Sequence, residues 1–471
     1  MILFVLFLAF VLRFINLDQS LWFDEAINVV YAKSNDFWWF VTKYPIGDFH
    51  PPLYFAVIWL WGHIFSFGEF VIRIPSVLFG IATIFLTYLI GRKLFSKNIG
   101  LIAALFLSLA PLHIYYSQEA RMYSLAAFSA AFSSYFLLKL LEKEKFALFG
   151  YSFSVALVLY SDYLSYLILP AHLLFVFIYY KSIFNKYLLS LFLGVCSIIP
   201  WLFVFPGQLK SGIEKSAMIG GWREVVGGLG VKEVLLLPVK ILIGRITFEN
   251  KLIYAILLFL ISLPHIIGFK KILSFLSEKV NYLLLWLFIP VISALILSLF
   301  MPVFSYFRLL FILPAFYILL AFALDKYKHK IKLILITLII FFEIITSGVY
   351  LLNSQFHRED WRSAVSLINN RSNIQTLVLH KNSEIPAPFK YYQLNSIQSI
   401  AVFKKIPVHS SSDFVNLEET LMQFNKIFIF NYLVDITDPN RVLEKEIERL
   451  GFKKIKDYDF RGVGFIYEFE K

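Results

Sequence analysis

The feature that most constrains this chain is a series of apolar segments that recurs as far as residue 351. A helix of roughly 17–25 apolar residues is long enough to cross a bilayer. The whole chain is 59% hydrophobic and 16% charged, whereas about a quarter of the residues of a soluble domain are charged. We therefore predict a polytopic α-helical membrane protein with about eleven transmembrane helices. The apolar segments lie near residues 1–17, 71–91, 99–116, 123–141, 146–161, 164–180, 187–205, 251–269, 282–300, 307–324 and 331–351.

The basic excess of the chain belongs to its apolar part. The net charge is +12, from 44 Lys and Arg against 32 Asp and Glu. From Asn353 onward there are 16 basic and 15 acidic residues, which leaves 28 basic and 17 acidic residues before it. Such an excess orients helices in a membrane, so it does not indicate nucleic-acid binding. The single cysteine, Cys196, excludes an intrachain disulfide.

The basic residues also predict the topology. Five short connections hold 15 basic residues, and the alternate short connections hold only Arg121. Positive connections stay in the cytoplasm. The apolar stretch 51–67 decides the orientation, because the N-terminus is outside if it spans and inside if it lies flat. Its Trp and Tyr content and Pro-Pro start favour an interfacial helix. We therefore predict a plasma (inner) membrane protein with a cytoplasmic N-terminus and one large outer loop, 18–70.

Two further regions are predicted outside the membrane. The long outer connection 205–250, which contains the Gly-rich stretch GGWREVVGGLG, is typical of a mobile lid or a second interfacial segment. The apolar part ends at Leu352, and residues 353–471 alternate strand-like and helical patterns, which predicts a small extracytoplasmic α/β domain. The strands are expected near 376–380, 398–403, 426–432 and 464–469, and the helices near 360–370, 413–424 and 439–450.

An acidic pair, Asp24 and Glu25, follows the first apolar segment within SLWFDEA. Carboxylates at a membrane edge are costly unless water, a metal or a substrate meets them. Either the pair is merely solvated, or it serves a reaction. In the second case one carboxylate is a general base and the other orients it or binds a metal or sugar hydroxyls.

Other polar residues lie in or next to the predicted outer connections. His50 in HPPLY is either an interfacial histidine or a substrate ligand. Glu119, Arg121 and Tyr123 lie in YSQEARMYSL, and Arg308 lies at a helix end. Each arginine is either an anchor or a clamp for a phosphate, whose oxygens match a guanidinium in a bidentate fashion. All five are candidate donor-phosphate or substrate ligands.

Taken in order, these motifs resemble a known family. SLWFDEA, HPPLY, GEFVIRIPSVLFG, GRKLF, YSQEARMYSL and REDWR occur in this sequence between about residues 10 and 365. The chain resembles the bacterial and archaeal relatives of dolichyl-phosphate-mannose protein mannosyltransferases and, more distantly, the lipid A aminoarabinose transferase. These are membrane glycosyltransferases with the GT-C fold.

The resemblance implies an inverting transfer of one sugar from a polyprenyl-phosphate donor on the outer face of the membrane. Asp24 would take the proton of the acceptor, Glu25 would lie beside it, and Arg121 would hold the donor phosphate. The acceptor is a hydroxyl of a lipid, a glycan or a protein. Relatives often carry Tyr-Thr-His-Tyr where this chain has Tyr-Ser-Asp-Tyr, which places Asp162 at that histidine's position. A divalent metal is possible, but no spacing in the sequence establishes a site for one.

Two other classes of function use similar residues. A polar-lipid transporter or flippase would need the acids and arginines for binding only, and a non-catalytic glycan-assembly protein would not need them together. Transporters of many folds contain inverted repeats with broken helices at the membrane midplane. The chain shows no internal repeat, and its polar motifs gather at one face, so the glycosyltransferase is the favoured interpretation.

Overall fold

The computed structural model describes residues 1–218, 230–394 and 396–471, and these form two compact units. The first unit contains Met1–Leu17, Asp36–Lys210 and the described residues of Val226–Phe356. The second contains Asp18–Asn35, His357–Lys471 and the described residues of Ser211–Val225. The acidic segment that follows the first apolar helix therefore belongs to the same unit as the C-terminal domain. Of the predicted lid or interfacial segment 205–250, residues 219–229 lie outside the described residues, and the described part includes the helices Phe205–Met218 and Val231–Ile243. Its role as a lid or interfacial segment stays a prediction.

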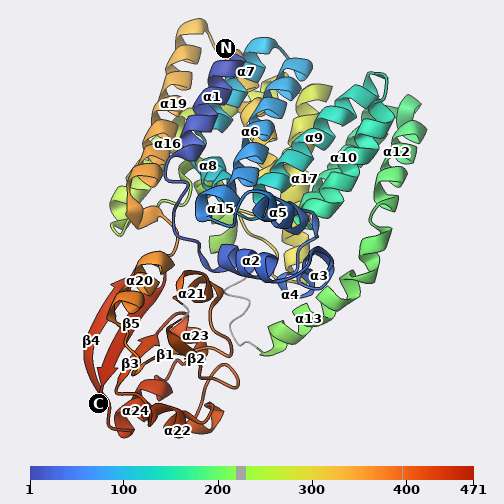
Figure 1. Cartoon of the computed structure of the whole chain (residues 1–471). Helices are drawn as coiled ribbons and strands as arrows, with labels where there is room; N and C mark the ends of the chain where they lie inside the picture. Colours follow the sequence, from blue (N-terminus) through green and yellow to red (C-terminus); the bar gives the residue numbers. More distant parts are fainter. Residues whose placement is uncertain (219–229, 395) are drawn as a thin grey trace. The chain divides into compact units, whose positions relative to one another are not determined.

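The first unit is helical throughout its described residues (Figure 1). All eleven predicted apolar segments form helices in it. The main helices are α1 (Ile2–Phe14), α3 (Phe37–Thr42), α4 (Pro45–Asp48), α5 (Leu53–Ile64), α6 (Glu69–Leu94), α7 (Lys97–Leu109), α8 (Pro111–Ser117), α9 (Tyr123–Leu141), α10 (Ala147–Ser161), α11 (Ile168–Tyr179), α12 (Phe184–Cys196), the start of α13 (Phe205–Met218), α15 (Val231–Ile243), α16 (Lys251–Phe269), α17 (Glu278–Ser298), α18 (Leu313–Asp325) and α19 (His329–Leu352).

The number of helices that are long enough to cross a membrane is smaller than the predicted eleven. Among the described residues, five helices qualify by length and hydropathy, and two bent pairs raise the number to seven. The bent pairs are α7 with α8, at 64°, and the segment Leu164–Tyr179 with Lys181–Cys196, at 112°. α1, α10 and the segment Leu310–Asp325 are apolar but shorter. A helical architecture with several candidate membrane spans is therefore present, whereas the exact count of spans stays a prediction.

The predicted interfacial segment forms helix α5, of 12 residues. At 1.5 Å per residue this helix is about 18 Å long, which is short of the roughly 30 Å hydrocarbon core. Its apolar side chains Leu60 and Ile64 are 49% and 68% exposed. A short helix with exposed apolar residues agrees with an interfacial position, and the inside N-terminus stays a prediction.

A break between α7 and α8 lies shortly before the connection that carries Glu119 and Arg121. Pro111 begins α8 and has no backbone N–H, so carbonyls at the end of α7 lose their helical partners. The buried guanidinium of Arg13 donates to the carbonyls of Ser108 and Leu107, at 3.1 and 3.4 Å. The hydroxyl of Ser347 donates to the carbonyl of Leu109 at 2.6 Å. These bonds satisfy carbonyls that the break leaves without helical partners and so offset its cost.

The second unit contains the predicted α/β sheet (Figure 1). Its strand order is β2-β1-β3-β5-β4; β1 pairs in parallel with β2 and β3, and β5 pairs antiparallel with β3 and β4. The elements of this unit are α2 (Phe23–Ser34), α20 (Trp361–Arg371), β1 (Thr376–His380), α21 (Ala387–Tyr392), β2 (Gln398–Ala401), α22 (Leu417–Leu421), β3 (Lys426–Phe430), α23 (Val434–Thr437), α24 (Val442–Arg449), β4 (Lys453–Phe460) and β5 (Gly464–Glu470).

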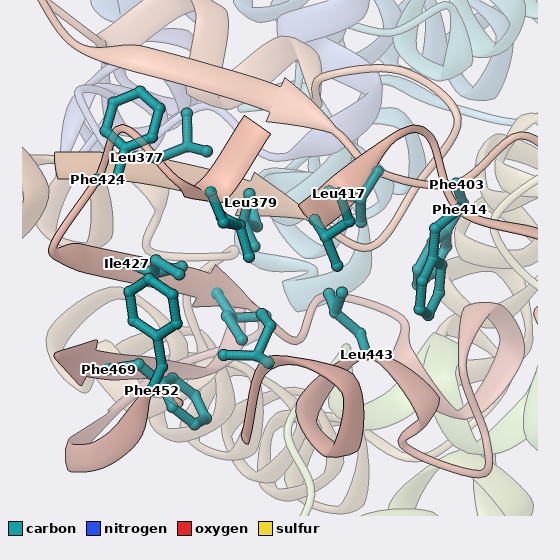
Figure 2. Packing of buried hydrophobic residues seen from close by; sticks show 14 of the residues in the cluster. Leu377, Leu379, Phe403, Phe414, Leu417, Phe424, Ile427, Leu443, Phe452 and Phe469 are labelled. Carbon is teal, nitrogen blue, oxygen red and sulfur yellow. The ribbon is translucent and has the colours of Figure 1, made fainter. Parts of the chain in front are cut away.

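Two apolar clusters cover the two faces of this sheet. Alternate residues of β1 enter different clusters, as the pleat requires: Leu377 and Leu379 pack in one and Val378 in the other. The first cluster includes Leu417 of α22 and Leu443 of α24 (Figure 2). The second cluster is formed with α20 and α21, and Phe23 of α2 packs against it. The helix that carries the acidic pair is thus built into the hydrophobic packing of the second unit.

Candidate functional site

A carboxylate that the sequence motifs did not single out organises the polar residues of the first unit. Asp48, at the end of α4, accepts hydrogen bonds from both terminal nitrogens of Arg121, at 2.9 and 3.4 Å. The same carboxylate lies 2.5 Å from Nδ1 of His50. Nε2 of His50 in turn lies 3.9 Å from a carboxylate oxygen of Asp162. The structure therefore brings His50 and Arg121, from two distant motifs, onto one carboxylate.

The electrostatics of Asp48 follow from these contacts. Burial alone would raise the pKa of Asp48, but the charges of Arg121 and His50 and their hydrogen bonds lower it further than burial raises it. The pKa of Asp48 is therefore held well below its usual range, and the carboxylate is ionised at neutral pH. The guanidinium of Arg121, which is almost fully buried, has this carboxylate as an anionic partner. The sequence predicted a donor phosphate as the anionic partner of Arg121. In the structure Asp48 is such a partner, and contact of Arg121 with a phosphate stays a proposal.

The backbone around His50 is held from a second direction. The amide of Gln208, at the start of α13, donates to the carbonyls of Pro45 and His50, at 2.7 and 3.0 Å. Gln208 accepts a hydrogen bond from the Tyr163 hydroxyl, which accepts one from Trp201 at 2.9 Å. The Gln208 amide therefore holds the backbone on both sides of Asp48, and this fixes the position of His50.

A second cation in the first unit, Arg245, was not predicted from the sequence. It follows α15, is exposed, and places its guanidinium 5.0 Å from the centre of the Tyr115 ring. It also interacts electrostatically with Glu119, Tyr116 and Tyr306. Glu119, one of the predicted ligands, is buried. An accessible guanidinium beside tyrosine hydroxyls can bind an anion, since both groups donate hydrogen bonds.

The remaining predicted ligands of the first unit have packing roles. Tyr123 is buried and makes edge-to-face contacts with Tyr116 and Phe307, each at 5.2 Å between ring centroids. Arg308 is half-buried and donates to the carbonyl of Val303 at 3.2 Å, within its own loop. Tyr123 thus packs against Tyr116 and Arg308 stabilises its own loop, and a role in substrate binding stays a proposal for each.

The predicted catalytic acids lie in the second unit, in the first turn of α2. Asp24 is partly exposed, whereas Glu25 is fully buried. Negative charge is stabilised at a helix N-terminus. Of the two, Asp24 is the more exposed carboxylate and Glu25 is part of the interior, and the role of a general base stays a proposal for Asp24.

A third carboxylate, Glu359 of the REDWR segment, borders the start of α2. It accepts hydrogen bonds from the backbone N–H of Phe23 at 3.0 Å, the indole of Trp361 at 2.7 Å and the hydroxyl of Tyr432 at 3.1 Å. Burial raises the pKa of Glu359 to about 7, the three hydrogen bonds oppose that rise, and the charge of Asp24 adds to it. Asp24 and Glu359 are thus electrostatically coupled within one unit.

Neither a metal site nor, in the groove of the second unit, an anion site is evident among the described residues. Across residues 1–218, 230–394 and 396–471, no group of three or more His, Cys, Asp and Glu side chains is arranged to hold a metal ion. A shallow groove of about 720 Å³ lies beside the edge strand β2 and has no basic residue in its lining. An anionic ligand therefore finds no counter-charge there. The groove is lined by Leu377, Ile385, Gln393, Ile397, Gln398, Ser399, Ile400, Glu419, Thr420, Gln423 and Phe424.

Comparisons with known proteins agree with the predicted resemblance. The family model for dolichyl-phosphate-mannose-protein mannosyltransferases matches residues 49–204, which include His50, Arg121 and Asp162. No curated protein matches the sequence significantly. The structure is similar to that of ArnT from Cupriavidus metallidurans in the apo state, with a TM-score of 0.63, 12% identity, and coverage of 99% of this chain and 97% of that chain.

Two further solved structures extend the comparison. ArnT from the same organism bound to undecaprenyl phosphate matches with a TM-score of 0.60, 12% identity and the same coverage. The Archaeoglobus fulgidus oligosaccharyltransferase in complex with Zn and sulfate matches with a TM-score of 0.55 and 13% identity, over 98% of this chain and 72% of that chain. At such identities the similarity shows the fold, and it confirms the predicted GT-C fold.

Proposed function

We propose that this chain is an integral membrane glycosyltransferase that moves a sugar from a polyprenyl-phosphate donor to an acceptor hydroxyl on the outer face of the membrane. The observation that carries the proposal is Arg245, an exposed residue that places its guanidinium beside the Tyr115 ring within an apolar unit. An arginine within an apolar membrane unit marks a candidate site for an anionic substrate. The phosphate of a lipid supplies both the charge and the membrane location, and ArnT of the same fold has been solved with undecaprenyl phosphate bound.

The reaction needs a base for the acceptor and a counter-charge for the leaving phosphate. The acceptor hydroxyl must lose its proton as its oxygen attacks the anomeric carbon, and Asp24 is the base that takes this proton. The bond between the anomeric carbon and the phosphate oxygen breaks, and the polyprenyl phosphate leaves as an anion. Arg245 and its neighbouring tyrosines stabilise that developing charge. One displacement of this kind inverts the configuration of the anomeric carbon.

The Asp48, His50 and Arg121 cluster has a different part in this proposal. Because Asp48 already neutralises Arg121, we assign Arg121 first to the placement of His50 and Asp48, and only second to direct contact with the donor phosphate. Glu25 is buried beside Asp24 and orients its helix turn. No step is assigned to a metal ion.

The proposal is tested with the full chain reconstituted in lipid nanodiscs. Purified polyprenyl-phosphate hexoses are supplied with a membrane extract as the acceptor source, and released polyprenyl phosphate is measured by mass spectrometry. We expect release that depends on both the donor and the extract. In proteoliposomes, movement of intact sugar lipid between the leaflets without release of polyprenyl phosphate would instead identify a flippase and contradict the proposal.

A further inference from the structure

We infer that Glu359 of the REDWR segment is a positioning residue that fixes the catalytic base Asp24, which makes the C-terminal α/β domain part of the catalytic machinery. This inference rests on the proposed function, because it assumes that Asp24 is the base. Its structural part concerns residues of the second unit only.

The start of α2 depends on Glu359 for a hydrogen bond that the helix cannot supply itself. Phe23 is the first residue of α2, and the amides of a first helical turn have no acceptor within the helix. Trp22, at the N-cap position, makes no side-chain cap. The carboxylate of Glu359 accepts the Phe23 N–H instead, from 336 residues further along the chain. Asp24 is the next residue, so this bond fixes the backbone from which the base projects.

Neighbouring contacts hold the rest of SLWFDEA to the same domain. The Ser20 hydroxyl accepts the backbone N–H of Arg362 at 3.1 Å, and the Tyr392 hydroxyl accepts the backbone N–H of Leu21 at 2.8 Å. The Phe23 ring stacks on that of Tyr432, with 5.5 Å between centroids. The contacts reach three separate parts of the domain, so the acidic motif is held by tertiary structure and not by its own helix alone.

Glu359 is itself placed by the turn between β4 and β5. The backbone N–H of Asp360 donates to the carbonyl of Arg461 at 2.8 Å, and the Arg461 side chain donates to the carbonyl of Arg358 at 2.9 Å. Gly462 has φ +72°, and a Cβ there would lie 2.8 Å from Cγ of Glu359. Any larger residue at 462 must therefore displace Glu359.

This packing provides a pair of matched variants. Gly462→Ala pushes on Glu359 without touching Asp24. Gly451→Ala is its control, because Gly451 has φ +93° and a Cβ added there would meet no atom within 4 Å. Both alanines carry the strain of a left-handed conformation, but only the first reaches Glu359. A second pair is Glu359→Ala and Glu359→Gln, since a glutamine oxygen still accepts the Phe23 N–H and its amide can donate to the Tyr432 hydroxyl.

The experiment measures amide hydrogen exchange across α2 and donor-dependent turnover on the full-length variants in nanodiscs. We expect Glu359→Ala and Gly462→Ala to speed exchange in the first turn of α2 and to lower kcat by about tenfold or more, with the KM for donor unchanged, because small displacements of a catalytic group are costly. Gly451→Ala and Glu359→Gln should both stay within about twofold of wild type.

Each arm can fail separately. Unchanged exchange in α2 of Glu359→Ala overturns the anchoring, whatever the activity does. Faster exchange with unchanged kcat overturns the link to catalysis. Equal loss of kcat in Gly451→Ala and Gly462→Ala also overturns the inference, because it shows a general effect of strain. Normal turnover in Asp24→Asn would instead defeat the proposed function, while the exchange measurement would still report on the anchor.

Discussion

Two half-buried carboxylates, one in each unit, are stabilised in opposite ways. Asp48 in the first unit pairs with the cation Arg121 and lies within hydrogen-bond distance of His50, and its pKa is lowered. Glu359 in the second unit accepts hydrogen bonds from an amide, an indole and a phenol, all neutral, and its pKa is raised to about 7. Burial disfavours the charged form in both. The difference shows that the charge of the partner, and not burial, decides whether such a carboxylate is ionised at neutral pH.

This difference suits the parts that we assign to the two units. A fixed ion pair gives the first unit a rigid frame around His50. In the second unit, the carboxylate of Glu359, whose pKa is raised to about 7, accepts the backbone N–H that precedes the proposed base Asp24 and so fixes the start of α2. Variants that remove a charged or hydrogen-bonding partner of either carboxylate test this comparison.

The largest effect on stability is expected from removing the cation of the first unit. Arg121→Ala leaves Asp48 buried without its main counter-charge, which should cost about 3–5 kcal/mol of the free energy of unfolding. Arg121→Lys keeps the charge but loses the bidentate geometry, so it should cost less. Thermal unfolding and folded yield in detergent measure both. If Arg121→Ala unfolds like the wild type, the ion pair is not the frame described here.

Arg245→Ala should affect the donor and not the fold. The loss of a hydrogen bond to a charged group costs about 1.5–3 kcal/mol, which is roughly ten- to a hundredfold in donor affinity. Donor titration, normalised to folded protein, separates this from Arg121→Lys, for which a smaller change is expected. Equal donor affinity in Arg245→Ala and wild type would show that Arg245 does not bind the donor phosphate, and Arg121 would again be the candidate ligand.

The pH dependence of stability should have opposite signs in the two regions. Glu359 has a raised pKa, so its contribution is fully present below its ordinary value of 4.5 and is lost as pH rises through about 7. Asp48 has a lowered pKa, so its contribution is present above its ordinary value of 3.8 and is lost only as pH falls below it. Unfolding midpoints between pH 4 and 8 should change less with pH in Glu359→Gln. An unchanged slope in that variant would contradict the raised pKa.

The smallest effect is expected from Tyr432→Phe. This change removes one hydrogen bond to Glu359 and keeps the stack on Phe23, so it should cost about 0.5–1.5 kcal/mol. It should also raise the pKa of Glu359 further, since a donor to the carboxylate is lost. Denaturant unfolding at pH 5 and pH 8 measures both, and a larger loss at pH 5 than at pH 8 would contradict the account.

The sequence was sufficient for the helices and most of the sheet, because apolar periodicity decides both. The strand β4 was missed because its residues, KKIKDYDF, are mostly charged and exposed, as is common for a protective edge strand. Helix α21 was missed since it spans only six residues.

The sequence motifs identified several residues of the candidate site, but they did not predict which of these residues contact one another. The motifs singled out His50, Arg121 and Asp24, whereas Asp48 stands two residues before HPPLY and belongs to no motif. Arg245 follows a Gly after an apolar helix and gave no pattern signal. The assignment of Asp24 to the second unit depends on contacts with Glu359 and Tyr432, and no local pattern contains contacts across such separations.

The central claim is that Asp24 takes the proton of the acceptor. Asp24→Asn keeps the size of the side chain and removes the base, so turnover should fall by about 10²-fold or more while donor affinity and folded yield stay near wild type. Polyprenyl phosphate release from a purified donor, measured on Asp24→Asn and wild type side by side, tests this directly. Turnover within a few-fold of wild type in Asp24→Asn would contradict the account.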